Sequence, residues 1–94
     1  MNDRYNEFCE LCLVMMGIYK TKNHDYGDSS SKTYDKFGAV SYLTRMNDKL
    51  NRIEQLTYFS DEQMVKDESA IDNLLDLASY CLQMAMDLKE NKPF

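Results

Sequence analysis

The stretch from Lys66 to Asp87 constrains the fold most, because apolar residues recur in it at helical spacing from end to end. The stripe continues one residue beyond Asp87 and consists of Ile71, Leu74, Leu75, Ala78, Cys81, Leu82, Ala85 and Leu88. Such a stripe is typical of a helix face that packs against a core. We therefore predict a long final helix, capped by Asp67, with this face buried.

A second stripe on the same predicted helix is acidic and consists of Glu68, Asp72 and Asp76. Carboxylates four residues apart repel each other by about 0.2–0.5 kcal/mol per pair in an isolated helix. A cation should therefore lie opposite this stripe. The two candidates are a bound metal ion and a basic helix.

The composition indicates an all-α domain. The 94 residues contain only three glycines and one proline, and Met and Leu recur at helical intervals. We predict one domain over residues 1–94, folded as a compact antiparallel bundle of three long helices plus a short one. A bundle this small leaves apolar surface for another subunit, so we expect oligomerisation to complete it.

The charge and hydropathy of the chain argue against several partners. A formal net charge of -5 weighs against direct binding of nucleic acid, which usually needs a basic excess. It does not oppose a small phosphate ligand. No apolar run approaches the length of a membrane span, and the first residues lack the pattern of a signal peptide, so we expect a cytoplasmic protein without membrane contact.

Two further long helices are predicted before the final one. The first, capped by Asn2 or Asp3, runs to about Lys20 and is expected to bury Phe8, Leu11, Cys12, Met15, Ile18 and Tyr19. The second runs from about Val40 to Tyr58 and is expected to bury Leu43, Met46, Leu50, Ile53 and Thr57. A capping-box pattern at Ser60 and Gln63 predicts a short helical turn over residues 61–64.

The second of these helices also carries a basic stripe with an aromatic residue at its head: Tyr42, Arg45, Lys49 and Arg52. Asp48 stands four residues before Arg52 and can pair with it. The structural interpretation is that this stripe neutralises the acidic one across an antiparallel helix pair. The functional interpretation is that the acids hold Mg²⁺ while the basic residues meet the phosphates of a nucleotide.

Residues 20–38 are the least periodic part of the chain, and we predict a binding loop there. Gly27 and Gly38 permit backbone conformations that other residues avoid. The loop contains Lys22, His24, Asp25, Tyr26 and Asp28. This mixture suits a nucleotide, because the ring can stack on a base and the cation can meet phosphate. The alternative is an ordered turn with Tyr26 in the core.

Four blocks of sequence together resemble a phage and bacterial family called nucleotide modification associated domain type one. They are KNHDYGDS at 22–29, the Phe-Gly pair at 37–38, R-x-x-DK-x-x-R at 45–52 and V-x-DES-x-x-D-x-x-x-DLA-x-Y at 65–80. The resemblance covers about residues 8–88. It also implies kinship with the all-α, MazG-like nucleoside triphosphate pyrophosphohydrolases.

This resemblance implies a metal site made from two acidic motifs. MazG-like enzymes bind Mg²⁺ with E-x-x-E on one helix and an E-x-x-D or E-x-x-x-D motif on a later one. Glu68 and Asp72 match the later motif, and Asp76 continues it. The earlier motif is not matched where expected: Glu7 and Glu10 have its spacing but lie on the first helix, and the second helix offers Asp48 and Glu54 among basic residues.

We therefore form one leading hypothesis and one alternative. In the first, the protein is an oligomeric, nucleotide-binding relative of the Mg²⁺-dependent pyrophosphohydrolases, phage-encoded and acting in nucleotide metabolism or modification. Glu68, Asp72, Asp76 and Asp48 hold the metal. The nucleotide meets Lys22, His24, Asp25, Tyr26, Tyr42, Arg45, Lys49 and Arg52. In the alternative, a phage protein sequesters a host signalling nucleotide without catalysis.

Overall fold

The computed structural model describes residues 3–59, 69–90, 92 and 94, and four helices account for most of them. The helices are α1 (Asp3–Tyr26), α2 (Ser29–Phe37), α3 (Val40–Thr57) and α4 (Ala70–Lys89). No strand occurs within these described ranges. The all-α prediction is therefore confirmed.

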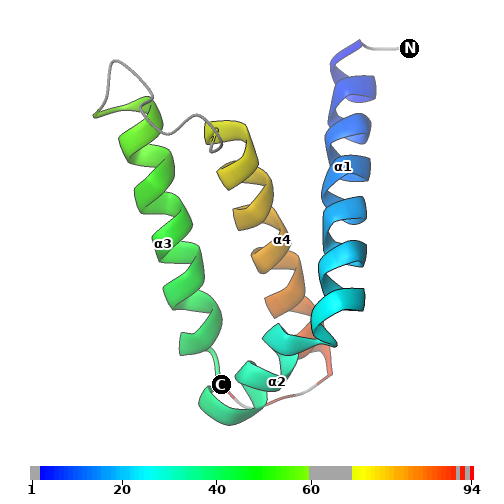
Figure 1. Ribbon diagram of the computed structural model, residues 1–94, viewed down its shortest axis with the longest axis vertical. Coiled ribbons are helices and arrows are strands. Elements are labelled where there is room, and N and C mark those ends of the chain that lie inside the picture. Colours follow the sequence, from blue (N-terminus) through cyan, green and yellow to red (C-terminus); the bar gives the residue numbers. More distant parts are fainter. Residues whose placement is uncertain (1–2, 60–68, 91, 93) are drawn as a thin grey trace.

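The three long helices lie next to one another, with α4 between α1 and α3 (Figure 1). Helices α3 and α4 run antiparallel and make the most extensive contact in the molecule, while α2 crosses the end at which α1 and α4 finish. The chain measures 40 × 36 × 23 Å and its radius of gyration is 14.9 Å. A compact chain of this length has a radius of gyration of about 12 Å. The bundle is therefore more open than predicted.

The prediction of a loop over residues 20–38 is wrong. Helix α1 continues to Tyr26, and Ser29–Phe37 forms α2. Only Gly27 and Asp28 separate the two helices, both in the left-handed region with φ of 58°. Helix α2 has no apolar stripe from which the sequence could predict it. Its inward side carries Ser30 and Ser31, which bond to other helices, and Tyr34 is its buried aromatic residue.

The second predicted long helix is confirmed as α3, and the final one as α4. Helix α4 begins later than expected, because Ser69 caps it: the Ser69 hydroxyl accepts a hydrogen bond from the Asp72 backbone N–H at 3.0 Å. The expected cap Asp67 and the helical turn predicted over residues 61–64 lie outside the described residues.

The faces predicted to form the core are largely exposed, which corrects the packing expected from the apolar stripes. Ile71, Leu74 and Leu82 of α4 are 59, 49 and 55% exposed. Leu43 and Leu50 of α3 are also exposed. The faces that pack inside the chain are more polar, and among the described residues the buried ones are Tyr34, Tyr42, Asn73 and Asp87. The apolar stripes thus face away from the chain's own interior.

Gly38 joins α2 to α3 in a conformation that suits glycine. Its φ is 76°, and an added Cβ would overlap the carbonyl group of Phe94. That carbonyl accepts a hydrogen bond from the Ala39 backbone N–H at 2.7 Å. The final residue is thereby held against the α2–α3 junction.

We expect Gly38→Ala to destabilise the fold by about 1–3 kcal/mol, through backbone strain and displacement of Phe94. Urea unfolding measures the change. The matched control is Gly17→Ala, because Gly17 lies inside α1 and an added Cβ there would meet open space. The control should stabilise the protein by up to about 1 kcal/mol. Equal effects at the two glycines would contradict the account.

Candidate functional site

A cavity of about 530 Å³ lies where the second half of α1, the start of α2, the first half of α3 and the middle of α4 meet. Its volume is in the range of small-molecule sites, about 300–1,000 Å³. Its lining is mixed, with hydroxyl, amide, charged and aromatic groups. The lining residues are Ile18, Tyr19, Lys22, Asn23, Tyr26, Asp28, Ser29, Ser30, Arg45, Asp76, Ser79, Tyr80 and Gln83.

Arg45 brings a positive charge from α3 to this cavity. Its Nη1 donates a hydrogen bond to the Ser30 hydroxyl at 2.8 Å, and its guanidinium carbon lies 5.9 Å from the centre of the Tyr80 ring. Among the described residues, no carboxylate lies within ion-pair distance of Arg45. A half-buried guanidinium held by a serine and a ring has further N–H donors with which to bind an anion.

The start of α2 adds backbone donors beside Arg45. The first hydrogen bond of this helix runs from the Lys32 N–H to the Asp28 carbonyl, at 3.0 Å. The N–H groups of residues 29–31 precede it and have no partner within the helix. No side chain caps this end. Such an end favours negative charge, so it reinforces Arg45 as a place for an anion.

Asp76 holds the opposite side of the cavity and bridges two lysines. Its carboxylate lies 3.1 Å from Lys49 Nζ and 3.9 Å from Lys22 Nζ. The Asp76 and Lys49 side chains are only 26 and 17% exposed. This contact supports the structural interpretation of the two stripes, because an acid of α4 does pair with a base of α3.

Three tyrosines surround the same space. Tyr19 and Tyr26 come from α1, and Tyr80 comes from α4. Tyr26 is 70% exposed and is the last residue of α1. A flat aromatic surface next to an anion-binding group is the arrangement that receives a base and its phosphate together.

A second, smaller cavity of about 280 Å³ adjoins the first and shares Arg45 and Tyr80 with it. Thr44, Asp48 and Lys49 complete its lining. Asp48 also lies 3.3 Å from the Arg52 Nε, in the pairing that the sequence predicted. Arg45 therefore lines both cavities, and each cavity has both positive and negative side chains in its wall.

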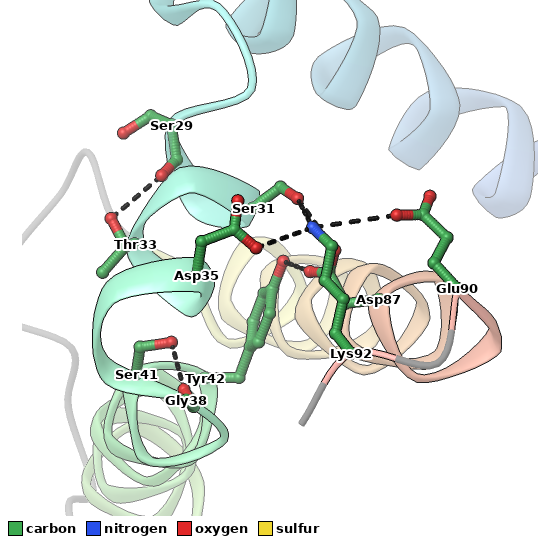
Figure 2. Close-up of polar contacts among 10 residues, drawn as sticks. All are labelled: Ser29, Ser31, Thr33, Asp35, Gly38, Ser41, Tyr42, Asp87, Glu90 and Lys92. Carbon is green, nitrogen blue, oxygen red and sulfur yellow. Dashed lines mark hydrogen bonds and ion pairs between the residues drawn. The ribbon is translucent and has the colours of Figure 1, made fainter. Parts of the chain in front are cut away.

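A partly buried ion cluster links α2 to the end of α4 (Figure 2). Asp87 accepts hydrogen bonds from the Tyr42 hydroxyl at 2.6 Å and the Ser31 hydroxyl at 2.8 Å. Lys92 Nζ lies 2.8 Å from the same carboxylate and 3.0 Å from that of Asp35. Since Ser31 follows Ser30, the cluster holds the turn of α2 that faces Arg45.

The cluster shifts the proton affinities of its members. Burial would raise the pKa of Asp87, but the hydrogen bonds from Lys92, Tyr42 and Ser31 outweigh it and hold that pKa below 3.8. Burial, followed by the bond to Asp87, raises the pKa of Tyr42. Hydrogen bonds to Asp87 and Asp35 raise the pKa of Lys92. At neutral pH the cluster is therefore an ion pair with a neutral tyrosine.

The structure brings some of the predicted nucleotide-binding residues together and separates others. Lys22, Tyr26 and Arg45 line the larger cavity, and Lys49 lines the smaller one. His24 and Asp25 lie 3.4 Å apart on the exposed side of α1 and line neither of these two cavities. Arg52 pairs with Asp48 outside the larger cavity.

The predicted stacking role of Tyr42 is corrected by its position. This residue is 1% exposed, and its ring centre lies 5.5 Å from that of Tyr34. Its hydroxyl donates a hydrogen bond to the Asp87 carboxylate. The residue takes part in the core, where a base has no access to the face of its ring.

The predicted metal ligands do not come together in the described part of the chain. No group of three His, Cys, Asp or Glu side chains suited to a metal ion occurs there. Asp76 faces two lysines, Asp48 faces Arg52, and Asp72 lies in the capped first turn of α4. Glu68 lies outside the described residues. Asp76 and Asp48 are thus engaged in ion pairs within this structure.

The sequence does not single out several residues of the site. Ser30, Tyr80 and Gln83 line the cavity, and Asp87 and Lys92 support it. One signal was present: Asp76, Tyr80, Gln83 and Asp87 recur at spacings of four, three and four on α4. That polar stripe lies opposite the apolar stripe, and its regular spacing marks the inward face.

The sequence matches the model of the nucleotide modification associated domain 1 family over residues 22–88. The chain belongs to this family. The matched range contains every residue that lines the larger cavity except Ile18 and Tyr19. The resemblance found in the four sequence blocks is thereby confirmed, and the family description places the domain in the context of nucleotide modification.

Searches among curated proteins and among solved structures give no significant match. The helices that the structure describes include none with the length and apolar character needed to cross a membrane.

Proposed function

We propose that the protein binds a nucleotide in the larger cavity between α1, α2, α3 and α4. The observation that carries the proposal is Arg45: a half-buried cation, positioned by Ser30 and Tyr80, with no acidic partner among the described residues. In this proposal the guanidinium, the Ser30 hydroxyl and the start of α2 hold a phosphate. The family description and the size of the cavity support the same ligand class.

In this proposal Tyr26 stacks on the base and Lys22 closes the phosphate side. Both residues extend from the last turns of α1 into the cavity lining. Stacking of a base on an aromatic side chain contributes about 1–3 kcal/mol. Because every base offers a flat face, this contact favours nucleotides in general over one base.

Binding without catalysis is the form of the proposal that the geometry favours. Mg²⁺-dependent pyrophosphohydrolysis remains a second candidate, supported by the match of Glu68 and Asp72 to the later MazG-like motif. In that candidate the metal would polarise a phosphate and supply a bound water as nucleophile. The ion pairs of Asp76 and Asp48 oppose it, because these carboxylates already face cations.

We propose further that the protein works as a homo-oligomer, in the cytoplasm where nucleotide pools are found. The chain exposes 7394 Å² of surface. A compact monomer of this mass exposes about 5,700 Å². Helix α1 has no buried residue, and the apolar stripe of α4 is exposed. A second copy is a suitable cover, because self-complementary patches are the rule in symmetric oligomers.

Calorimetric titration with a panel of nucleotides, in the presence of EDTA, tests the binding proposal. The wild-type protein should bind at least one of them, and Tyr26→Leu should weaken that affinity by about 10-fold through loss of stacking. The matched control is Tyr58→Leu, because Tyr58 is a similarly exposed tyrosine that does not line the cavity. Equal losses of affinity in the two variants would contradict stacking on Tyr26. Pyrophosphate release that requires Mg²⁺ and Glu68 would favour the catalytic candidate.

A further inference from the structure

We infer that the cavity selects a nucleotide with a single phosphate group over nucleoside diphosphates and triphosphates. This inference rests on the proposed function and specifies its ligand. It follows from the balance of charge on the cavity wall and from the place at which the anion-binding groups gather.

The wall of the larger cavity carries equal numbers of positive and negative side chains. Lys22 and Arg45 are cationic, and Asp28 and Asp76 are anionic. The adjoining cavity adds Lys49 and Asp48, one of each sign. The two cavities together therefore offer no net positive charge. Each phosphate added to a nucleotide brings at least one negative charge at neutral pH.

The groups that can receive a phosphate are concentrated at one point. Arg45 and Ser30 lie in hydrogen-bond contact, and the N–H groups at the start of α2 are adjacent in sequence. Lys22 also lines the cavity, with its Nζ 3.9 Å from the Asp76 carboxylate. One phosphate therefore meets several donors. Lys22 and Lys49 share the Asp76 carboxylate, which offsets part of their charge, so they attract further phosphates less strongly.

Further phosphates would approach carboxylates. Asp28 stands directly before α2 and lines the cavity, and Asp76 lines it beside Lys22 and Lys49. Negative charges brought together in a partly enclosed space repel each other strongly, because solvent screening is reduced there. The second and third phosphates of a triphosphate would therefore meet repulsion from these carboxylates that a monophosphate avoids.

Titration with the monophosphate, diphosphate and triphosphate of each of the four common bases tests the inference, at fixed ionic strength and with EDTA. We expect the monophosphate of the preferred base to bind at least about 10-fold more tightly than its triphosphate. Triphosphate binding that is equal or tighter overturns the inference and leaves nucleotide binding standing. Absence of binding by every nucleotide overturns the proposed function, and the inference with it.

Asp28→Asn tests the physical cause. Asn has the same shape and tolerates the left-handed conformation of residue 28, so the fold should be kept. In this variant we expect the ratio of the triphosphate to the monophosphate dissociation constant to fall by about 5-fold, because the cavity wall has one carboxylate fewer. Asp25→Asn is the matched control, since Asp25 does not line the cavity and should leave the preference unchanged. If Asp28→Asn leaves this ratio unchanged, the charge of the cavity wall is not the cause of the preference for monophosphate.

Discussion

Replacing Asp87 with alanine should lower the free energy of unfolding by about 2–4 kcal/mol, a large share of the stability of a domain this size. The side chain of Asp87 is 4% exposed and accepts hydrogen bonds from Tyr42, Ser31 and Lys92. Its removal leaves the buried Tyr42 hydroxyl without this acceptor and removes the nearest carboxylate from Lys92. Urea unfolding, followed by circular dichroism, measures the loss.

Asp35→Asn is the matched control for this prediction. Asp35 contacts the same Lys92, but its side chain is 57% exposed. Exposed ion pairs contribute about 0–1 kcal/mol, so the control should change stability little. Comparable losses in Asp87→Ala and Asp35→Asn would show that burial of the cluster does not determine its contribution.

The cluster also sets the direction of the pH dependence. Because the folded pKa of Asp87 lies below its ordinary value of 3.8, its contribution is present above that pH and is lost as the pH falls through the folded value. Tyr42 and Lys92 have raised pKa values, so their contributions are lost as the pH rises above about 10. Asp87→Asn should therefore remove part of the loss of stability on the acid side.

If the protein is the homo-oligomer that we propose, replacing Leu74 with lysine should convert the assembly to single chains. Leu74 lies in the apolar stripe of α4 and is 49% exposed within one chain. A charge placed there would need to be desolvated against a second copy, so the dissociation constant should rise by about 100-fold or more. Light scattering coupled to size-exclusion chromatography should give at least twice 11.1 kDa for the wild type and 11.1 kDa for the variant.

Asn51→Lys adds the same charge at an exposed position of α3, away from its apolar stripe, and should keep the wild-type mass. A wild-type protein that already runs as a single chain would contradict the oligomer proposal. In that case the apolar stripe of α4 would need another partner.

The site was predicted in part. The chemistry of Lys22, Tyr26 and Arg45 predicts that they contact a ligand, and they line one cavity. The same reasoning predicts contact for Tyr42, which is buried instead. Residue type and helical spacing alone do not distinguish these cases, because Arg45 follows Tyr42 by less than one turn. Which of the two meets solvent depends on where α2 crosses α3.

The sequence by itself determined the helical class, the presence of α3 and α4 and the family. These properties follow from spacing along the chain and from ordered motifs, which need no knowledge of contacts. The tertiary structure alone decided that α1 extends to Tyr26, that serines form the inward side of α2 and that Asp87 is buried. It also decided which face of α4 points inward. Periodicity shows which residues share a face, but whether that face meets the same chain or its surroundings is determined only by how the helices pack.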